Sequence, residues 1–291
     1  MIIRGTLLLV VLWSLSAHSL ERVMALPPAD YQDGATDSYN FKALDAALRE
    51  TEEKYGPYEI IRYERPIVSN RLLRELEHGK LSVAISAYKQ AWEGKAVAVP
   101  FPMYRGLASY RMFFVSKDVK MKTAQVESLQ DLKRFRFGQG AGWSTAKVLE
   151  DAGFDIVYST VSDRLIGMLD AKRFELLMRS PAEILFEWPT VQKQSEDLFI
   201  EDKIAIYTYL PMYFYVPLDR PVLAERLEVG LKSLFESGQL DELMAPTFSE
   251  QKALIGQTKR KVFYLKNTNL KPGMYERDKP YLIDIGITHP Q

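Results

Sequence analysis

The residues best suited to chemistry lie in a glycine-rich bend at 138–145, which reads GQGAGWST. Residues 135–137 before it are typical of a short strand, and a helix is expected to begin near Ser144. A strand that enters a helix through such a bend leaves backbone N–H groups unpaired at the helix start, where the helix dipole adds partial positive charge. The bend therefore predicts a cradle for a carboxylate or another anion. Its residues are Gly140, Trp143, Ser144 and Thr145.

Two enzymatic interpretations of this bend are weaker. A dinucleotide site needs the spacing G-x-G-x-x-G and an acidic residue after the next strand, and the strand expected at 155–159 ends without one. A serine hydrolase needs Ser144 as nucleophile; Asp284 and His289 follow in the order serine, acid, histidine, but lie in a tail without clear strand–loop context. Helix capping by Ser144 or Thr145, or a plain strand–helix turn, is the simpler alternative. We therefore expect a binding protein rather than an enzyme, with no cofactor.

The charge balance and the rarity of metal-binding residues exclude several classes of function. Lysine and arginine together number 38, and so do aspartate and glutamate, so the chain has no basic surplus with which to bind nucleic acid. The absence of cysteine excludes disulfides, thiolate metal sites and a cysteine nucleophile. The three histidines lie far apart, without metal-ligand spacing. We expect neither a nucleic-acid partner nor a metal site.

The N-terminus has the pattern of a secretory signal peptide. Arg4 precedes the apolar run 7–13, and the small residues Ala17 and Ser19 stand at the spacing of a cleavage site before Leu20. A membrane anchor is the alternative, but this run is much shorter than the roughly 20 apolar residues of a spanning helix, and no later stretch is long enough. The sequence thus predicts a signal peptide at 1–19 and an exported mature protein.

Strands and helices are expected to alternate in two successive blocks, the pattern of parallel sheets covered by helices. After the second block we expect a β-rich region at 198–216, a helix at 222–237, a short helix at 240–244, and from 246 an irregular or edge segment packed on the first block. The elements expected in the first block are a strand at 21–26, a helix at 39–54, a strand at 58–65, a helix ending near 79 and a strand at 81–86. Those expected in the second are strands at 110–116, 135–137, 155–159 and 174–178, with helices after 128, 144, 165 and 180.

Four segments in this order resemble the extracellular solute-binding protein family 3. They are ALRETEEKYGPYEI at 47–60, LLRELEHGKLSVAIS at 72–86, PMYRGLASYRMFFVSKD at 102–118, and SLQDLKRFRFGQGAGWSTAKVLEDAGF at 128–154. The resemblance covers about residues 36–245 and is strongest to a divergent branch with an Arg-Gly-Leu-x-x-Tyr-Arg run, here at 105–111.

This resemblance implies the type II periplasmic binding protein fold, an α/β fold of two lobes joined by two crossing strands, here near 110–115 and 207–216. Lobe 1 would comprise residues 20–115 and 211–291, and lobe 2 residues 116–210. It also implies a periplasmic, monomeric protein that captures a small polar or anionic solute between its lobes.

Two departures from the family bear on the solute. Members that bind amino acids usually place an arginine shortly before the Pro-x-Tyr element and an aspartate after the strand corresponding to 174–178. This chain has no arginine in 87–97, and it has Arg179 in place of the aspartate. Because a guanidinium cannot accept a hydrogen bond, it cannot hold the ammonium group of a ligand. The departures favour an anionic or sugar-like solute over an ordinary α-amino acid.

We expect Arg179 to contact the solute, with Arg105 as a second clamp and Tyr88 as a wall, since pockets are rich in aromatic residues. Each has a structural alternative: an internal ion pair for Arg179, a hinge-loop contact for Arg105, and packing for Tyr88. The expected partners are a small-molecule solute, amino acid-like or anionic, and an ABC permease that reads the closed form. The sequence leaves open a ligand-sensing partner of a membrane receptor and a binding fold used only for protein contacts. Other aromatic candidates for the wall are Trp92, Tyr104 and Tyr110.

Overall fold

The computed structural model describes residues 19–25, 34–63 and 71–287, and only the backbone of residues 34–38 and 247. Most of the expected signal peptide and the candidate base His289 lie outside the described residues. No helix in the described ranges is both long enough and apolar enough to span a membrane.

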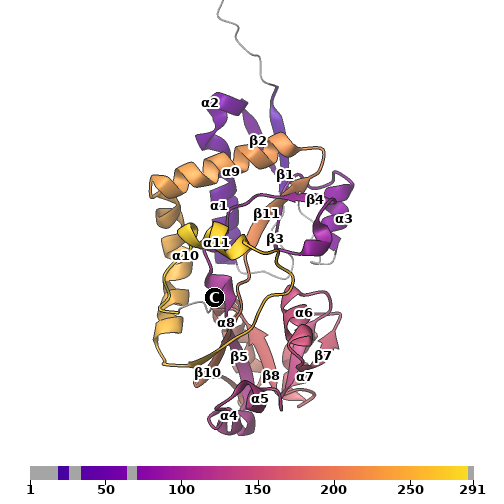
Figure 1. Cartoon of the computed structure of the whole chain (residues 1–291), viewed down its shortest axis with the longest axis vertical. Coiled ribbons are helices and arrows are strands. Elements are labelled where there is room, and N and C mark those ends of the chain that lie inside the picture. The colour runs from indigo at the N-terminus through magenta and orange to yellow at the C-terminus, as the bar shows by residue number, and fades with distance from the viewer. Residues whose placement is uncertain (1–18, 26–33, 64–70, 288–291) are drawn as a thin grey trace, which may run out of the picture.

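The first lobe, in the upper half of Figure 1, is built on short strands. Strand β1 lies parallel to β2, and Ala25 at its end bridges to Val83, next to β3. Strands β3 and β4 both pair antiparallel with β11, so a strand from late in the chain completes this lobe. The strands are β1 (Glu21–Ala25), β2 (Tyr58–Arg62), β3 (Ala84–Ala87), β4 (Ala96–Ala98) and β11 (Met212–Pro217). The helices are α1 (Gly34–Glu50), α2 (Glu52–Tyr55), α3 (Leu72–Glu77) and α9 (Pro221–Glu236).

Helices α1 and α9 of this lobe lie in close contact. A Cβ atom at Gly230 of α9 would lie 2.2 Å from the carbonyl oxygen of Ala47, so only glycine allows this approach. Leu44 and Leu48 of α1 lie at helical spacing and are buried in the core, while Phe41 on the same face is half-buried. Burial of such faces is the main source of stability for helices of this length.

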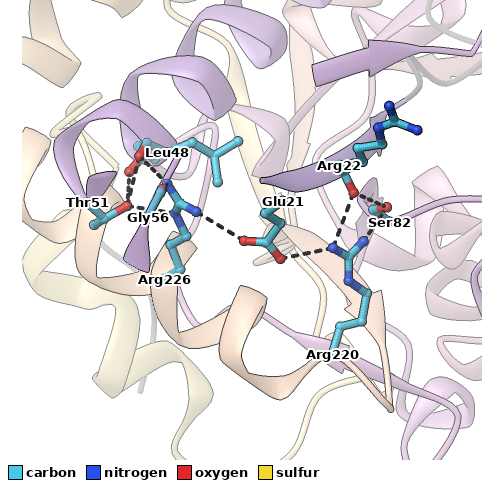
Figure 2. Close-up of polar contacts among 9 residues, drawn as sticks. Glu21, Arg22, Leu48, Thr51, Gly56, Ser82, Arg220 and Arg226 are labelled. Carbon is cyan, nitrogen blue, oxygen red and sulfur yellow. Dashed lines mark hydrogen bonds and ion pairs between the residues drawn. The ribbon is translucent and has the colours of Figure 1, made fainter. Parts of the chain in front are cut away.

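Buried ion pairs also tie α9 to the first strand (Figure 2). Arg226 of α9 is fully buried, and its Nη1 lies 3.1 Å from Oε2 of Glu21. Its Nη2 donates to the carbonyl oxygens of Leu48 and Gly56, and its Nε to the hydroxyl of Thr51. Glu21 also accepts from Arg220 at 2.9 Å. One arginine thus fixes β1 and the end of α1 onto α9.

The second lobe, in the lower half of Figure 1, contains a seven-stranded sheet in the order β12-β10-β5-β8-β6-β7, with β9 also paired to β5. Strand β6 lies parallel to β7 and β8, and β5 lies antiparallel to β8 and β10. The strands are β5 (Tyr110–Ser116), β6 (Arg136–Gly140), β7 (Asp155–Ser159), β8 (Leu176–Arg179), β9 (Leu198–Ile200), β10 (Ile204–Tyr207) and β12 (Lys261–Tyr264). The helices are α4 (Lys117–Thr123), α5 (Leu129–Leu132), α6 (Ser144–Asp151), α7 (Arg164–Asp170) and α8 (Pro181–Gln194).

The chain passes between the lobes beside the pairing of β5 with β10, which joins Tyr110 to Tyr207. The second crossing strand was expected to be continuous over 207–216, and this expectation is wrong. Strand β10 ends at Tyr207 and β11 begins at Met212, with Pro211 between them. Proline supplies no N–H for a ladder, which is consistent with the interruption.

The C-terminal part differs most from the expectation. Helix α10 (Gln239–Gly256) continues through Pro246, and helix α11 (Met274–Asp278) follows β12. Leu240, Met244 and Phe248 are buried at helical spacing, so their packing outweighs the lost hydrogen bond at the proline. Since β12 pairs with β10, the tail does not pack on the first lobe alone. The helix expected after 180 is α8 (Pro181–Gln194), and it likewise continues through a proline, Pro189.

The burial of several tyrosines predicts that the folded protein loses stability at alkaline pH. Burial raises the pKa of Tyr39, Tyr209 and Tyr213 well above the ordinary value near 10, and for Tyr213 the charge of Asp278 raises it further. The folded protein therefore keeps protons that the unfolded chain releases above pH 10. The free energy of unfolding should be constant below that pH and fall above it by up to about 1.4 kcal/mol per pH unit for each such tyrosine. Urea unfolding between pH 8 and pH 11.5 measures this, and constant stability across that range would contradict it.

Candidate functional site

A cavity of about 90 Å³ lies between the two lobes. It has room for roughly six water molecules, or a solute with a similar number of non-hydrogen atoms. A more open pocket of about 470 Å³ adjoins it and shares Lys89, Trp143 and Ser144. The first lobe and the crossing segment contribute Leu72, Ile85, Ser86, Ala87, Lys89, Leu210 and Met212 to the inner cavity. The elements of the seven-stranded sheet contribute Arg111, Trp143, Ser144, Thr145, Ser162, Arg179, Glu183 and Glu187.

The glycine bend joins β6 to α6 and borders this cavity. Gly140 does not line the cavity; it lies under the indole of Trp143, and a Cβ atom there would be 2.2 Å from that ring. The hydroxyl of Thr145 donates to Oε1 of Gln139 at 2.7 Å, which fixes the bend. The buried Oγ of Ser144, in contrast, has no hydrogen-bond partner.

The start of α6 is not capped by its own side chains. The N-cap residue is Trp143, and it makes no side-chain cap bond, so capping by Ser144 or Thr145 is not observed. The backbone N–H of Ala146 bonds to the carbonyl oxygen of Trp143 at 3.1 Å, so the amides without an acceptor within the helix are those of Ser144 and Thr145. The unpartnered hydroxyl of Ser144 and these amides therefore form a group of donors beside the cavity, suited to an anion.

Arg179 lies at the end of β8, where it borders the cavity and also forms the internal ion pair that was the alternative to a solute contact. It lines the cavity, yet it is only 2% exposed and its Nε donates to both carboxylate oxygens of Glu187, at 2.9 and 2.8 Å. Its guanidinium lies over the indole of Trp143, 5.0 Å from the ring centre. This is the geometry of a cation–π contact. The ring of Trp143 thus contacts both the backbone at Gly140 and the guanidinium of Arg179.

Arg111 and Glu183 form a second ion pair in the cavity. Nη2 of Arg111, on β5, lies 3.0 Å from Oε2 of Glu183, on α8. Nη1 of Arg111 donates to the carbonyl oxygen of Ala108, and its Nε has no hydrogen-bond partner, although the residue is only 3% exposed. Glu183 also accepts from the backbone N–H of Ser180 in the capping box that begins α8.

The two glutamates have pKa shifts of opposite sign. Burial opposes the charge of Glu183, but Arg111, Arg179 and the hydrogen bonds from Ser180 outweigh it and lower the pKa of Glu183. Burial, assisted by the charge of Glu183, raises the pKa of Glu187 despite its pair with Arg179. As the pH falls, Glu187 is therefore protonated before Glu183, and its pairing with Arg179 weakens first.

Two of the site residues predicted from the sequence, Arg105 and Tyr88, are not among the residues that line the cavity. Arg105 donates from Nε to the carbonyl oxygen of Tyr281 at 2.7 Å, pairs with Asp241, and covers the ring of Phe235. Tyr88 is buried, bonds to Glu93 and contacts another tyrosine of the first lobe edge to face. The structure therefore gives Tyr88 the packing role that was its alternative. Arg105 makes neither the solute clamp nor a contact with the other lobe, because its side-chain partners all belong to the C-terminal range 211–291.

The residues that sequence reasoning missed are Arg111, Glu183 and Glu187. Arg111 is a single charge in the apolar run YRMFFV, and such a charge inside a buried strand calls for a partner. Glu183 and Glu187 follow Arg179 at steps of four residues, which places both carboxylates on the same face of α8. These signals were present but indicated no particular site.

The hydrolase interpretation gains no support in the described part of the chain. Oγ of Ser144 has no hydrogen-bond partner that could act as a base. Asp284 accepts from the backbone of Gly286, two residues further on. The described residues contain no group of three or more histidine, aspartate or glutamate side chains that could hold a metal ion.

No protein-family model matches this sequence, and no curated protein matches it. Solved structures match it well. An arginine-specific periplasmic binding protein of Salmonella typhimurium has a TM-score of 0.56 and 16% identity, over 78% of this chain and 99% of its own. An ancestral arginine-binding protein bound to arginine has a TM-score of 0.55 and 17% identity, over 79% and 98%. A histidine kinase sensor domain with similarity to periplasmic binding proteins has a TM-score of 0.55 and 16% identity, over 79% and 96%.

At these identities the comparisons establish the fold. It is the two-lobe α/β fold of the type II periplasmic binding proteins, as predicted. The matched structures are binding proteins and a sensor domain.

Proposed function

We propose that this protein is a periplasmic solute-binding protein that closes its two lobes on a small solute bearing a carboxylate or a similar anionic group. The observation that carries the proposal is a pair of buried donors without partners, Oγ of Ser144 and Nε of Arg111, both in residues that line the cavity between the lobes. Unpaired buried polar groups are costly and rare, so a cavity lined by two of them is suited to a polar ligand.

The solute class includes amino acid-like compounds. The sequence argument against them rested on two departures, the absence of an arginine in 87–97 and Arg179 in place of an aspartate. Arg111 supplies an arginine to the cavity from another position. Glu183 and Glu187 bring two carboxylates to the same cavity, and a carboxylate that pairs with arginine keeps lone pairs for an ammonium group. With Lys89, the charged lining carries two carboxylates and three cations, which suits a zwitterion or a monoanion.

Binding would shift the population toward the closed form, and no covalent bond would change. The proposed lobe boundaries are 20–115 with 211–291 for the first lobe and 116–210 for the second. Strand β12 and all but the last residue of β5 fall in the first of these ranges but pair into the sheet of the second lobe. The proposed protein is monomeric and delivers its solute to an ABC permease. The similar kinase sensor domain favours a second candidate, a ligand-sensing partner of a membrane receptor. A permease gene or a receptor gene beside this one would discriminate between them.

Thermal unfolding with a panel of small carboxylates and amino acids tests the proposal. The panel contains acetate, succinate, glycine and L-arginine, and for each the amide or amine that lacks the carboxylate. We expect at least one carboxylate to stabilise the protein, by about 2.7 kcal/mol at 100 times its dissociation constant, while its matched control does not. Mass spectrometry of the exported protein, purified without dialysis, should find a co-purifying acid. Flat melting temperatures together with an empty mass spectrum would refute the proposal.

A further inference from the structure

A C-terminal strap, residues 265–281, connects the two lobes. It begins after β12, on the edge of the seven-stranded sheet, and ends in α11 and the short 3₁₀ helix Lys279–Tyr281. In Figure 1 it is the yellow segment that rises from the lower lobe past α6 to α11. Its contacts are therefore in a position to influence how the lobes move.

The first contacts of the strap are with the crossing segment and the second lobe. Nδ2 of Asn267 donates to the carbonyl oxygen of Tyr209 at 2.8 Å, between β10 and β11. Oδ1 of Asn267 accepts from the backbone N–H and the side-chain amide of Asn269, at 3.0 and 2.9 Å. Thr268 bonds to Asp151 at the end of α6. Two asparagines thus form one connected, buried network.

Asn269 connects this network to the candidate site. Its Nδ2 donates to the carbonyl oxygen of Ser144 at 3.1 Å, and the residue is 8% exposed. Ser144 is the first residue of α6 and carries the unpartnered hydroxyl of the site. Asn269 also lines the outer pocket, beside Lys89 of the first lobe.

The other end of the strap is fixed to the first lobe. Nζ of Lys271 lies 2.6 Å from Oε1 of Glu93. The fully buried carboxylate of Asp278 accepts from the hydroxyl of Tyr209 at 2.6 Å and from that of Tyr213 on β11. Nη2 of Arg277 donates to the same Tyr213 hydroxyl.

We infer that the strap holds the lobes in their closed arrangement and that Asn269 is a positioning residue of the solute site. The strap has bonds to both lobes and to the segment between them, so an opening that moves the lobes apart at the strap would break the bonds at one end of it. The bond from Asn269 to Ser144 fixes the first turn of α6, whose donors face the cavity. The positioning role rests on the proposed function, whereas the effect on lobe closure does not.

Spin-label distances between the lobes test the closure without any solute. The chain has no cysteine, so Lys95→Cys on the first lobe and Lys193→Cys on the second are the only labelling sites. Asn269→Ala should remove the bond to Ser144 and raise the ratio of open to closed molecules about fivefold, the change expected for loss of one buried hydrogen bond. Lys271→Ala removes the exposed pair of the strap with Glu93 on the first lobe. It should shift the distances in the same direction but by less, because an exposed pair contributes only about 0–1 kcal/mol.

Lys266→Ala is the matched control, because this side chain lies in the same segment and is exposed. It should leave the distances as in the parent protein. Hydrogen exchange provides the second readout: Asn269→Ala should speed exchange in the first turn of α6, and Asn269→Asp, which keeps the shape but has no donor, should do the same. Unchanged distances in Asn269→Ala and Lys271→Ala would overturn the inference. Failure of every acid in the thermal panel would instead count against the proposed function alone.

Discussion

Replacing Arg226 with methionine is expected to lower the free energy of unfolding by about 3 kcal/mol, because removal of one partner from a buried ion pair leaves the other uncompensated. Methionine retains most of the side-chain volume but donates no hydrogen bond. The carbonyl oxygens of Leu48 and Gly56 would lose this donor inside the fold. Glu21 would keep its ion pair with Arg220, and the side chain of Glu21 is 22% exposed. The expected loss is therefore at the lower end of the range for buried ion pairs. Urea unfolding at pH 7 measures the change.

Arg22→Met is the matched control for this prediction. Arg22 is also an arginine of the first lobe paired with a glutamate, Glu59, but both side chains are more than half exposed. Exposed pairs contribute about 0–1 kcal/mol, so the control should remain close to the parent protein. Equal stability of the two variants would mean that burial of Arg226 does not determine its contribution.

The fold class could be predicted because its signals are local. The alternation of strands and helices in the two blocks depends on apolar spacing within each segment. The glycine bend depends on residues that are adjacent in sequence, and α6 begins at Ser144 as expected. Strand β6, in contrast, runs on to Gly140 and does not end at 137 as expected. The arrangement in two lobes was predicted from the resemblance of four segments to the solute-binding family.

Helix ends at proline could not be predicted in the same way. Pro189 and Pro246 each indicate a break, yet α8 and α10 continue through them. The deciding energy comes from residues such as Val191 and Phe248, which are buried against other elements of the fold. That burial is tertiary and is not visible in a local window.

The site was predicted only in part for the same reason. Trp143, Ser144, Thr145 and Arg179 line the cavity because the bend and the end of β8 lie at one edge of the sheet. Arg105 and Arg111 belong to a single run, and the sequence favoured Arg105. The fold brings Asp241 and the C-terminal tail to Arg105, whereas Arg111 lies on β5 and faces Glu183. Which arginine lines the cavity is decided by ion-pair partners that are 72 residues away for Arg111 and 136 residues away for Arg105.

The double variant Arg111→Met with Glu183→Gln is expected to weaken solute binding about 10- to 100-fold. A hydrogen bond to a charged group contributes about 1.5–3 kcal/mol, and Nε of Arg111 is the buried cationic donor without a partner in the cavity. Changing Glu183 together with Arg111 keeps the net charge of the site constant and avoids an unpaired buried carboxylate. Calorimetric titration with the compound that stabilises the parent protein most in the thermal panel measures the loss.

Arg105→Met separates this prediction from a general effect of losing a buried arginine. Arg105 is about as buried as Arg111, but its partners are the carbonyl of Tyr281 and Asp241, outside the cavity. The variant should be less stable and should bind with parental affinity. If Arg105→Met loses the affinity and the double variant keeps it, Arg105 is the clamp, as the sequence favoured. The solute then does not bind in the cavity between the lobes. If both keep it, the anionic group is held by the amides of α6 without help from either arginine.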